Sequence, residues 1–97
     1  MKQMLYKLIV PDNVAELIRS LHPHLKKKVR ASLQTILSEP NSGKALKDEL
    51  SGLRSFRVSK LRIVYKVYDK QVEIVAIGPR KHIYEETFRL MKEEKEK

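Results

Sequence analysis

The sequence predicts a small α+β domain in which a two-helix hairpin packs on a four-stranded antiparallel sheet and a further helix ends the chain. Its 97 residues make a single domain, residues 1–97, because domains cluster at roughly 100–150 residues. Apolar residues recur at helical spacing in two early segments, whereas three later segments are rich in the β-branched and aromatic residues that favour strands. The predicted order of elements is therefore β-α-α-β-β-β-α.

The first predicted strand, residues 4–10, ends at a proline. A helix is expected to begin next with Asp12 or Asn13 as its N-cap, because short polar side chains accept hydrogen bonds from the free backbone N–H groups of a helix start. Pro23 interrupts the helical pattern, so a second helix is expected over residues 25–38. Two antiparallel helices joined at this proline would form an αα-hairpin.

Turn-forming residues fill positions 39–43, which predicts a loop. Residues 44–52 suit a short connection that contains at most one helical turn. The three later strands are expected at residues 54–59, 62–68 and 71–77. Tight turns are expected to join them at Ser59-Lys60 and at Asp69-Lys70.

The final helix is expected to begin at Arg80, where apolar residues return to helical spacing. Its last part, residues 92–97, has mixed charge and is expected to fray. No run approaches the roughly 20 apolar residues needed to cross a bilayer, and the N-terminus lacks the apolar segment of a signal peptide. A cytoplasmic location is expected.

Apolar and basic side chains alternate along the second of the three later strands. Successive side chains of a strand point to opposite faces of its sheet. One face would carry Leu61, Ile63, Tyr65 and Val67, and the other would carry Arg62 and Lys66. We therefore expect a sheet with an apolar face and a cationic face, which would suit a phosphate backbone.

The formal charge of +9 and the pI near 9.9 favour binding to polyanions. Nucleic acid is the first candidate partner, an acidic protein the second and an anionic membrane surface the third, and a merely soluble basic protein stays open. Because the chain has no cysteine, disulfides, zinc thiolate sites and thiol nucleophiles are excluded.

Three sequence segments resemble one known family. They are LRSFRV at residues 53–58, LRIVYKV at residues 61–67, and VAIGPR at residues 75–80 with a tyrosine one helical turn later. Together with the element order, they resemble the RelE/ParE toxin superfamily, in particular its RelE-type branch. The chain departs from the pattern at Ser59, where glycine is usual, at Leu61, where an aromatic residue is common, and at Pro79, where histidine or lysine often stands.

The resemblance implies a toxin of a type II toxin–antitoxin system that a cognate antitoxin holds inactive. It also implies an endoribonuclease that cuts mRNA in the ribosomal A site without a metal or cofactor. In that chemistry the ribose 2′-OH attacks the adjacent phosphorus and leaves a 2′,3′-cyclic phosphate and a free 5′-OH. Fixed cations stabilise the negative charge that develops on the phosphoryl oxygens, and arginine suits this role because its planar fork stays charged.

The resemblance assigns catalytic roles to four residues, and His82 is a fifth candidate on chemical grounds. Arg62 and Arg80 match the two most characteristic arginines of RelE-type toxins, and Arg57 matches a basic position in the hairpin. Tyr84 matches a C-terminal tyrosine that stacks on a base or shares in proton transfer, although a core aromatic would show the same spacing. His82 is a candidate base because histidine titrates near neutral pH, but it stands one residue from the family position.

Further basic residues are candidates for binding RNA or the ribosome. They are Arg54, Lys60, Lys66, Lys81, Lys26, Lys27, Lys28 and Arg30. Phosphate contacts by such side chains would give an affinity that weakens with salt. Lys26, Lys27, Lys28 and Arg30 could equally form the outer face of an amphipathic helix.

Two rival functions stay open. A ParE-type toxin would act on DNA gyrase, but that branch generally lacks the residues that Arg62, Arg80 and Tyr84 match. A catalytically degenerate member would bind only RNA or its antitoxin.

Overall fold

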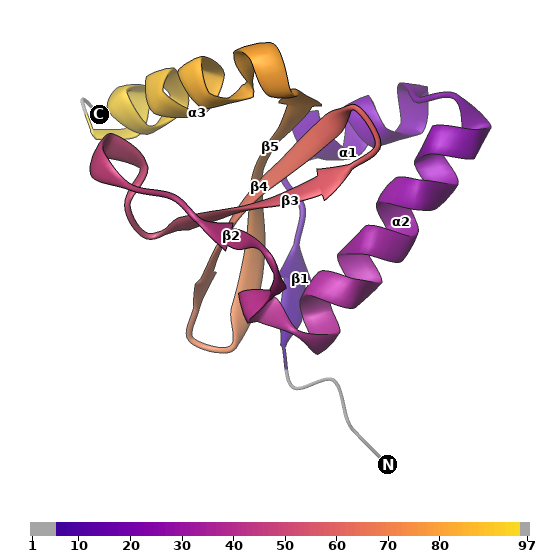
Figure 1. Ribbon diagram of the computed structural model, residues 1–97, viewed down its shortest axis with the longest axis horizontal. Helices are drawn as coiled ribbons and strands as arrows, with labels where there is room; N and C mark the ends of the chain where they lie inside the picture. Colours follow the sequence, from indigo (N-terminus) through magenta and orange to yellow (C-terminus); the bar gives the residue numbers. More distant parts are fainter. Residues whose placement is uncertain (1–5, 96–97) are drawn as a thin grey trace.

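The structure of the protein is a computed structural model that describes residues 6–95 and, within them, all side chains except those of Arg80 and residues 93–95. Its centre is a five-stranded sheet with the strand order β1-β5-β4-β3-β2 (Figure 1). The strands are β1 (Lys7–Ile9), β2 (Lys44–Ala45), β3 (Leu53–Val58), β4 (Leu61–Tyr68) and β5 (Gln71–Pro79). The predicted α+β class is confirmed.

The sheet differs from the prediction in its two edge strands. β2 is a fifth strand within the segment expected to be a connection, and its two residues pair with Arg54 and Ser55 of β3. Two residues are too few to produce a strand pattern in the sequence. β1 runs parallel to β5, so the expectation of an entirely antiparallel sheet is wrong. The chain leaves β1 through two helices and reaches the opposite edge of the sheet, so no hairpin forces β1 to be antiparallel to its neighbour.

Within residues 6–95, three α-helices and two short 3₁₀ turns accompany the sheet. They are α1 (Asp12–Ser20), α2 (Pro23–Ser38), η1 (Pro40–Ser42), η2 (Asp48–Leu50) and α3 (Arg80–Lys95). Neither Asp12 nor Asn13 caps α1, because the helix begins at Asp12 and Pro11 occupies the cap position without a side-chain hydrogen bond. α2 begins two residues earlier than expected.

Proline suits the first turn of a helix, where its missing N–H would have no partner, and this explains the early start of α2 at Pro23. The His22 side chain caps the helix, since its Nδ1 accepts a hydrogen bond from the His24 backbone N–H at 3.2 Å. α3 begins at Arg80 as predicted and continues to Lys95, which includes part of the tail. Fraying of that tail stays a prediction. No helix of residues 6–95 is long and apolar enough to cross a membrane.

Both predicted hairpin turns are present. Ser59, Asp69 and Lys70 adopt positive φ angles of 56°, 46° and 59°. Two consecutive residues of positive φ, as at Asp69 and Lys70, make the kind of tight turn that matches the twist of a hairpin. The strained conformation of Ser59 also explains why glycine would be usual at that position.

Helices cover both faces of the sheet. α1 and α2 bury one face, where Val29 and Ile36 of α2 pack with Ile63 and Tyr65 of β4 in the larger core. The predicted apolar face of β4 is confirmed, since Leu61 and Val67 also contact this core. α3 covers part of the opposite face (Figure 1).

The opposite face carries Arg62 and Lys66 as predicted, but it is only partly cationic. Val64 and Ala76 lie on it and form a second core with Leu53 of β3 and Ile83 of α3. A register shift after Val64 leaves Val75 without a cross-strand partner, and Val75 packs against the same core. Arg57 and Arg62 therefore lie on one side of this core, beside the β3–β4 turn, and Lys66 lies on the other side.

Candidate functional site

An arginine pair lies beside the β3–β4 turn. Arg57 of β3 and Arg62 of β4 are direct cross-strand partners, so both point to the same face of the sheet. Arg57 is exposed and Arg62 is half-buried. Among the described side chains, the ion pair within 4.0 Å joins Lys66 and Glu73. Neither arginine lies this close to a described carboxylate. Like charges placed directly opposite repel each other, and a bound anion would relieve this repulsion.

The start of α3 adjoins this pair. Arg62 is also the cross-strand partner of Gly78 on β5, and α3 begins two residues later at Arg80. A helix N-terminus carries free N–H groups and a partial positive charge, and no acidic residue occupies the first turn of α3. The side chain of Arg80 lies outside what the structure describes. The backbone thus places the helix start two residues from the cross-strand partner of Arg62.

Glycine at position 78 allows α3 to pack closely on the sheet. A Cβ atom there would lie 3.3 Å from the Cδ1 atom of Ile83, a tighter distance than most such contacts. Ile83 is fully buried in the second core. A residue with a Cβ atom at position 78 would therefore require the Ile83 side chain to shift by a few tenths of an ångström.

Tyr84 reaches the same face from the second turn of α3. Its ring packs against the second core, and its hydroxyl lies 3.2 Å from the Ser55 hydroxyl. Ser55 stands two residues before Arg57 on β3, so its side chain points to the same face as the arginine pair. Sequence reasoning missed Ser55. The signal that could have found it is its position two residues before Arg57, which places both side chains on one face of a strand.

His82 does not join this group. His82 lies on the exposed side of α3, where it lines a shallow depression with Glu85, Glu86 and Arg89. It is one residue from Ile83, which points into the core, so the helix turns it away from the sheet. Lys81 is exposed in the first turn of α3.

Lys66 and Lys60 lie near the two ends of β4. The Lys66 ammonium group is 3.7 Å from a Glu73 carboxylate oxygen and 5.3 Å from the centre of the Tyr68 ring. Val64 and the second core separate Lys66 from the arginine pair along β4. Lys60 is exposed in the turn that joins Arg57 to Arg62, so it is the nearer of the two lysines.

Arg54 points to the other face of the sheet and binds the loop after α2. Its guanidinium group donates hydrogen bonds to the Gly43 carbonyl at 2.7 Å and the Asn41 carbonyl at 3.3 Å. The buried Tyr65 hydroxyl secures the same loop, since it donates to the Pro40 carbonyl at 2.7 Å and accepts from the Gly43 N–H at 2.9 Å. The structure thus gives Arg54 a role in the fold, and its contact with RNA stays a prediction.

The basic residues of α2 form a separate group. Lys27, Lys28 and Arg30 are exposed and Lys26 is half-buried. α2 covers the face of the sheet opposite to α3, so these residues are not brought together with the arginine pair. Both interpretations of this group, as an RNA-binding surface and as a solvated helix face, are compatible with their exposure.

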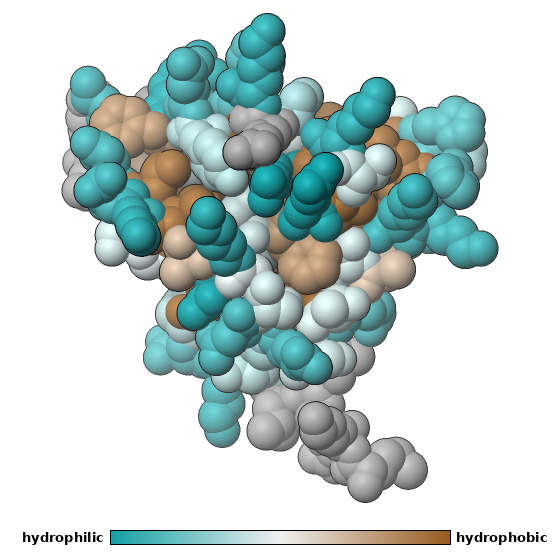
Figure 2. Space-filling view, viewed as in Figure 1, coloured by the Kyte–Doolittle hydropathy of each residue, from teal (hydrophilic) through white to brown (hydrophobic). Residues whose placement is uncertain are grey.

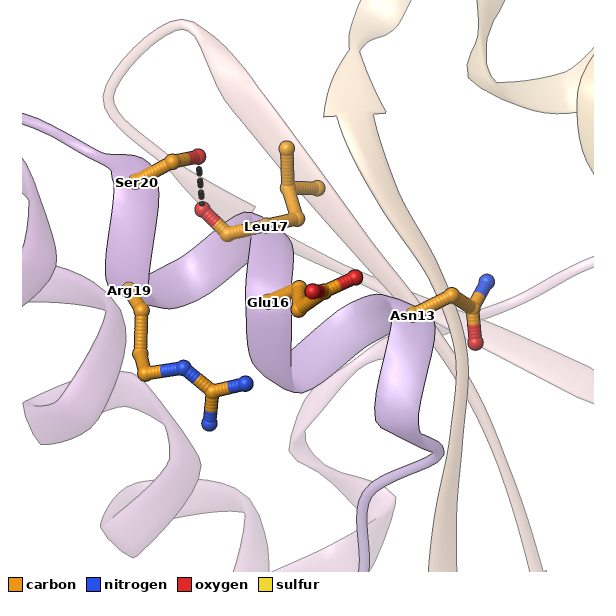
Figure 3. A pocket seen from close by; sticks show the side chains of 5 residues that line it. All are labelled: Asn13, Glu16, Leu17, Arg19 and Ser20. Atoms are coloured by element: carbon orange, nitrogen blue, oxygen red, sulfur yellow. Dashed lines mark hydrogen bonds between the residues drawn. The ribbon is translucent and has the colours of Figure 1, made fainter.

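Two further surface features lie away from the arginine pair. The exposed side of α1 carries a shallow depression lined by Asn13, Glu16, Leu17, Arg19 and Ser20 (Figure 3). An apolar patch near the C-terminal half of α3 includes Phe88, which is 43% exposed, and Met91, with Glu49 and Lys92 at its edge. Brown, hydrophobic atoms gather over this end of α3 in Figure 2.

Comparisons with known proteins agree with this fold. A family model described as the ParE toxin of the type II toxin–antitoxin system parDE matches residues 12–84. The chain belongs to the ParE toxin family. It is therefore a toxin of the type II class, and the resemblance to the RelE/ParE superfamily is confirmed. No curated protein matches the chain.

Solved structures of related toxins share the fold of this ParE-family toxin. The RelBE2 toxin–antitoxin complex of Mycobacterium tuberculosis is 25% identical, with 77% of this chain and 98% of that chain covered and a TM-score of 0.68. The archaeal RelE–RelB complex of Pyrococcus horikoshii is 24% identical, with 79% and 97% covered and a TM-score of 0.66. The chromosomal ParDE system of P. aeruginosa is 13% identical, with 79% and 98% covered and a TM-score of 0.62.

Proposed function

We propose that this ParE-family toxin is an endoribonuclease of the RelE type that cuts mRNA on the ribosome and thereby inhibits translation. The observation that carries the proposal is the cross-strand pair of Arg57 and Arg62 beside the start of α3. Two arginines on one face of the sheet and a nearby helix start supply positive charge there, and neither arginine has a described carboxylate partner. Such a place suits a phosphate group on which negative charge increases during reaction.

The proposed reaction needs no metal or cofactor. The 2′-oxygen of one ribose forms a bond to the adjacent phosphorus, and the bond from phosphorus to the 5′-oxygen of the next nucleotide breaks. The 2′-OH loses its proton and the leaving 5′-oxygen gains one, so the products are a 2′,3′-cyclic phosphate and a 5′-OH. Arg62 and Arg57 would hold the non-bridging oxygens, and Arg80 would add a third guanidinium group from the helix start.

Tyr84 is the better placed of the two candidates for proton transfer. Its hydroxyl lies over the face that carries the arginine pair, whereas His82 lies on the exposed side of α3. We therefore propose that Tyr84 stacks on a base or shares in proton transfer, and that His82 takes no direct part. Lys60 and Lys81 would contact the RNA near the site, and the basic group on α2 would contact rRNA phosphates.

An antitoxin is the second proposed partner. The related structures from M. tuberculosis and P. horikoshii are complexes of a toxin with its antitoxin. We propose that an acidic or amphipathic segment of a cognate antitoxin lies against the sheet of this toxin or displaces α3. The charge of +9 supports an acidic partner, and the exposed Phe88 supports an amphipathic one.

A chemically altered mRNA tests the proposed reaction. Purified toxin is added to ribosomes that hold a defined codon in the A site, and the cleaved ends are characterised. We expect a 5′-OH end and a 2′,3′-cyclic phosphate end, and no cutting of an mRNA with a 2′-deoxyribose at the cleaved position. Cutting of the 2′-deoxy mRNA would contradict attack by the 2′-OH.

Inhibition of DNA gyrase is the alternative function. The matching family model is the one described as the ParE toxin, and a ParDE system is among the structural neighbours. In this case the toxin would block gyrase supercoiling of plasmid DNA and leave ribosome-bound mRNA uncut. The cleavage assay and the supercoiling assay together discriminate between the alternatives, because each function is expected to give a positive result in only one assay.

A further inference from the structure

We propose that Ser55 is a positioning residue that holds the Tyr84 hydroxyl beside the arginine pair, a role that rests on the proposed ribonuclease function. Ser55 lies in the middle of β3, and only 2% of its surface is exposed. Its Oγ atom lies 3.2 Å from the Oη atom of Tyr84, and either hydroxyl can donate the hydrogen bond.

The surroundings of Ser55 leave its hydroxyl dependent on Tyr84. Its cross-strand partner on β4 is Val64, and the nearby second core consists of apolar side chains such as Leu53 and Ala76. A buried hydroxyl is unfavourable in such a place unless it forms a hydrogen bond. Among the described residues, no buried side-chain oxygen or nitrogen lacks a partner, and for Ser55 that partner is Tyr84.

The contact fixes a catalytic candidate relative to the arginine pair. Ser55 and Arg57 point to the same face of β3 and are two residues apart, a separation of about 6.6 Å along a strand. The Tyr84 hydroxyl is therefore anchored one step along the sheet from Arg57 and Arg62. Tyr84 stands four residues after Arg80, so the same contact also fixes how α3 is rotated about its axis at its N-terminus.

The hydrogen bond also leaves Tyr84 chemically competent. When the Ser55 hydroxyl donates to the Tyr84 oxygen, the phenolic proton is free to bind an oxygen of the RNA. In the opposite arrangement, the phenolic oxygen keeps a lone pair to accept a proton. Alanine would fill the same buried position without either effect, so packing alone does not require serine there.

A double-mutant cycle tests this role. The four proteins are the wild type, Ser55→Ala, Tyr84→Phe and the double variant. Single-turnover cleavage of A-site mRNA is measured at a temperature at which all four proteins are folded. Misplacement of a catalytic group by about 1 Å costs on the order of 100-fold, so we expect Ser55→Ala to lower the rate by about 10- to 100-fold. We expect no further loss when Ser55→Ala is added to Tyr84→Phe, because the hydroxyl that Ser55 positions is then absent.

Two controls separate positioning from folding. Thr87→Val removes another buried hydroxyl of the same region, which donates within α3 to the Ile83 carbonyl, and should leave the rate unchanged. Ser55→Thr keeps the hydroxyl and should keep most of the wild-type rate. Affinity for an uncleavable 2′-deoxy mRNA should be the same for the wild type and Ser55→Ala, since Ser55 does not touch the RNA.

Failure of this proposal differs from failure of the ribonuclease proposal. Equal losses from Ser55→Ala in the presence and absence of the Tyr84 hydroxyl, or an unchanged rate, would overturn the role of Ser55. A wild-type protein that arrests growth without cutting RNA would overturn the ribonuclease and, with it, the role of Ser55 that rests on it. A wild-type protein that does neither would overturn both.

Discussion

Arg57 and Arg62 face each other directly across the β3–β4 hairpin, and Arg62 faces Gly78 on its other side, two residues before α3 begins. Like charges at directly opposite strand positions repel each other, and a helix N-terminus carries a partial positive charge. Among the described side chains, no carboxylate lies within 4.0 Å of either arginine. We propose that this arrangement of positive charge serves to bind a phosphate group.

Loss of Arg62 should abolish most activity and leave the fold intact. We expect Arg62→Ala to lower single-turnover cleavage by about 100- to 1,000-fold, the usual effect of removing one preorganised donor. Arg62→Lys should restore only part of the rate, because lysine cannot bind phosphate in a bidentate manner. The thermal midpoint of Arg62→Ala should equal or exceed that of the wild type, since a repulsion is removed. Arg19→Ala, on the exposed side of α1, is the matched control.

Tyr84 and His82 should differ clearly in their effects on cleavage. Tyr84→Phe keeps the ring in the second core but removes the hydroxyl, and we expect a loss of about 100-fold or more. His82→Gln changes an exposed side chain on the far side of α3 and should lower the rate much less. Single-turnover rates of the two variants provide the comparison. A larger loss for His82→Gln would mean that the histidine reaches the RNA from outside.

Gly43 and Tyr65 should be coupled in stability. A Cβ atom at Gly43 would lie 2.5 Å from the Tyr65 hydroxyl oxygen, so Gly43→Ala should destabilise the fold by about 1–3 kcal/mol, the usual cost of overpacking. Tyr65→Phe leaves the Gly43 N–H and the Pro40 carbonyl without their partner and should cost about 1–3 kcal/mol. The hydroxyl oxygen is the nearest of the clashing atoms, although the ring carbon Cε1 at 2.9 Å remains in Tyr65→Phe, so the double variant should lose less than the sum. Urea unfolding of the four proteins measures this coupling, and additive losses would argue against the contact.

Stability should fall in alkaline solution through Tyr65. Burial raises the pKa of Tyr65 above its ordinary value of 10.0, although the Gly43 hydrogen bond and the charge of Arg54 oppose this. Above pH 10 the tyrosine of the unfolded chain loses its proton while the folded one keeps it, so the free energy of unfolding decreases as pH rises. Below pH 10 this contribution is fully present. Thermal midpoints between pH 8 and pH 11 should fall more steeply for the wild type than for Tyr65→Phe, and identical slopes would contradict the assignment.

Local patterns predicted the parts of the fold that depend on neighbouring residues. Alternation along β4 correctly placed Ile63 and Tyr65 in the larger core, and the residues around Ser59 and Asp69 correctly predicted both hairpin turns. The return to helical spacing correctly predicted the start of α3 at Arg80. Each of these signals lies within a few residues of the feature that it predicts.

Contacts between distant segments were not predictable in the same way. The pairing of β1 with β5 joins residues more than 60 positions apart, and Ser55 and Tyr84 meet across 29 positions. Arg54 and Arg62 look alike in the sequence, yet a loop carbonyl binds one and the other faces the candidate site. The structure was therefore needed to show which of these two arginines faces the candidate site.

The most direct test of the ribonuclease is made in growing bacteria. The wild-type toxin and Arg62→Ala are expressed from an inducible promoter, and primer extension on a translated reporter mRNA maps new 5′ ends. We expect growth arrest and new cuts inside the reading frame for the wild type, and neither for a folded Arg62→Ala protein at the same level. Growth arrest without cuts, or cuts that persist in Arg62→Ala, would contradict the assignment of the arginine pair to RNA cleavage.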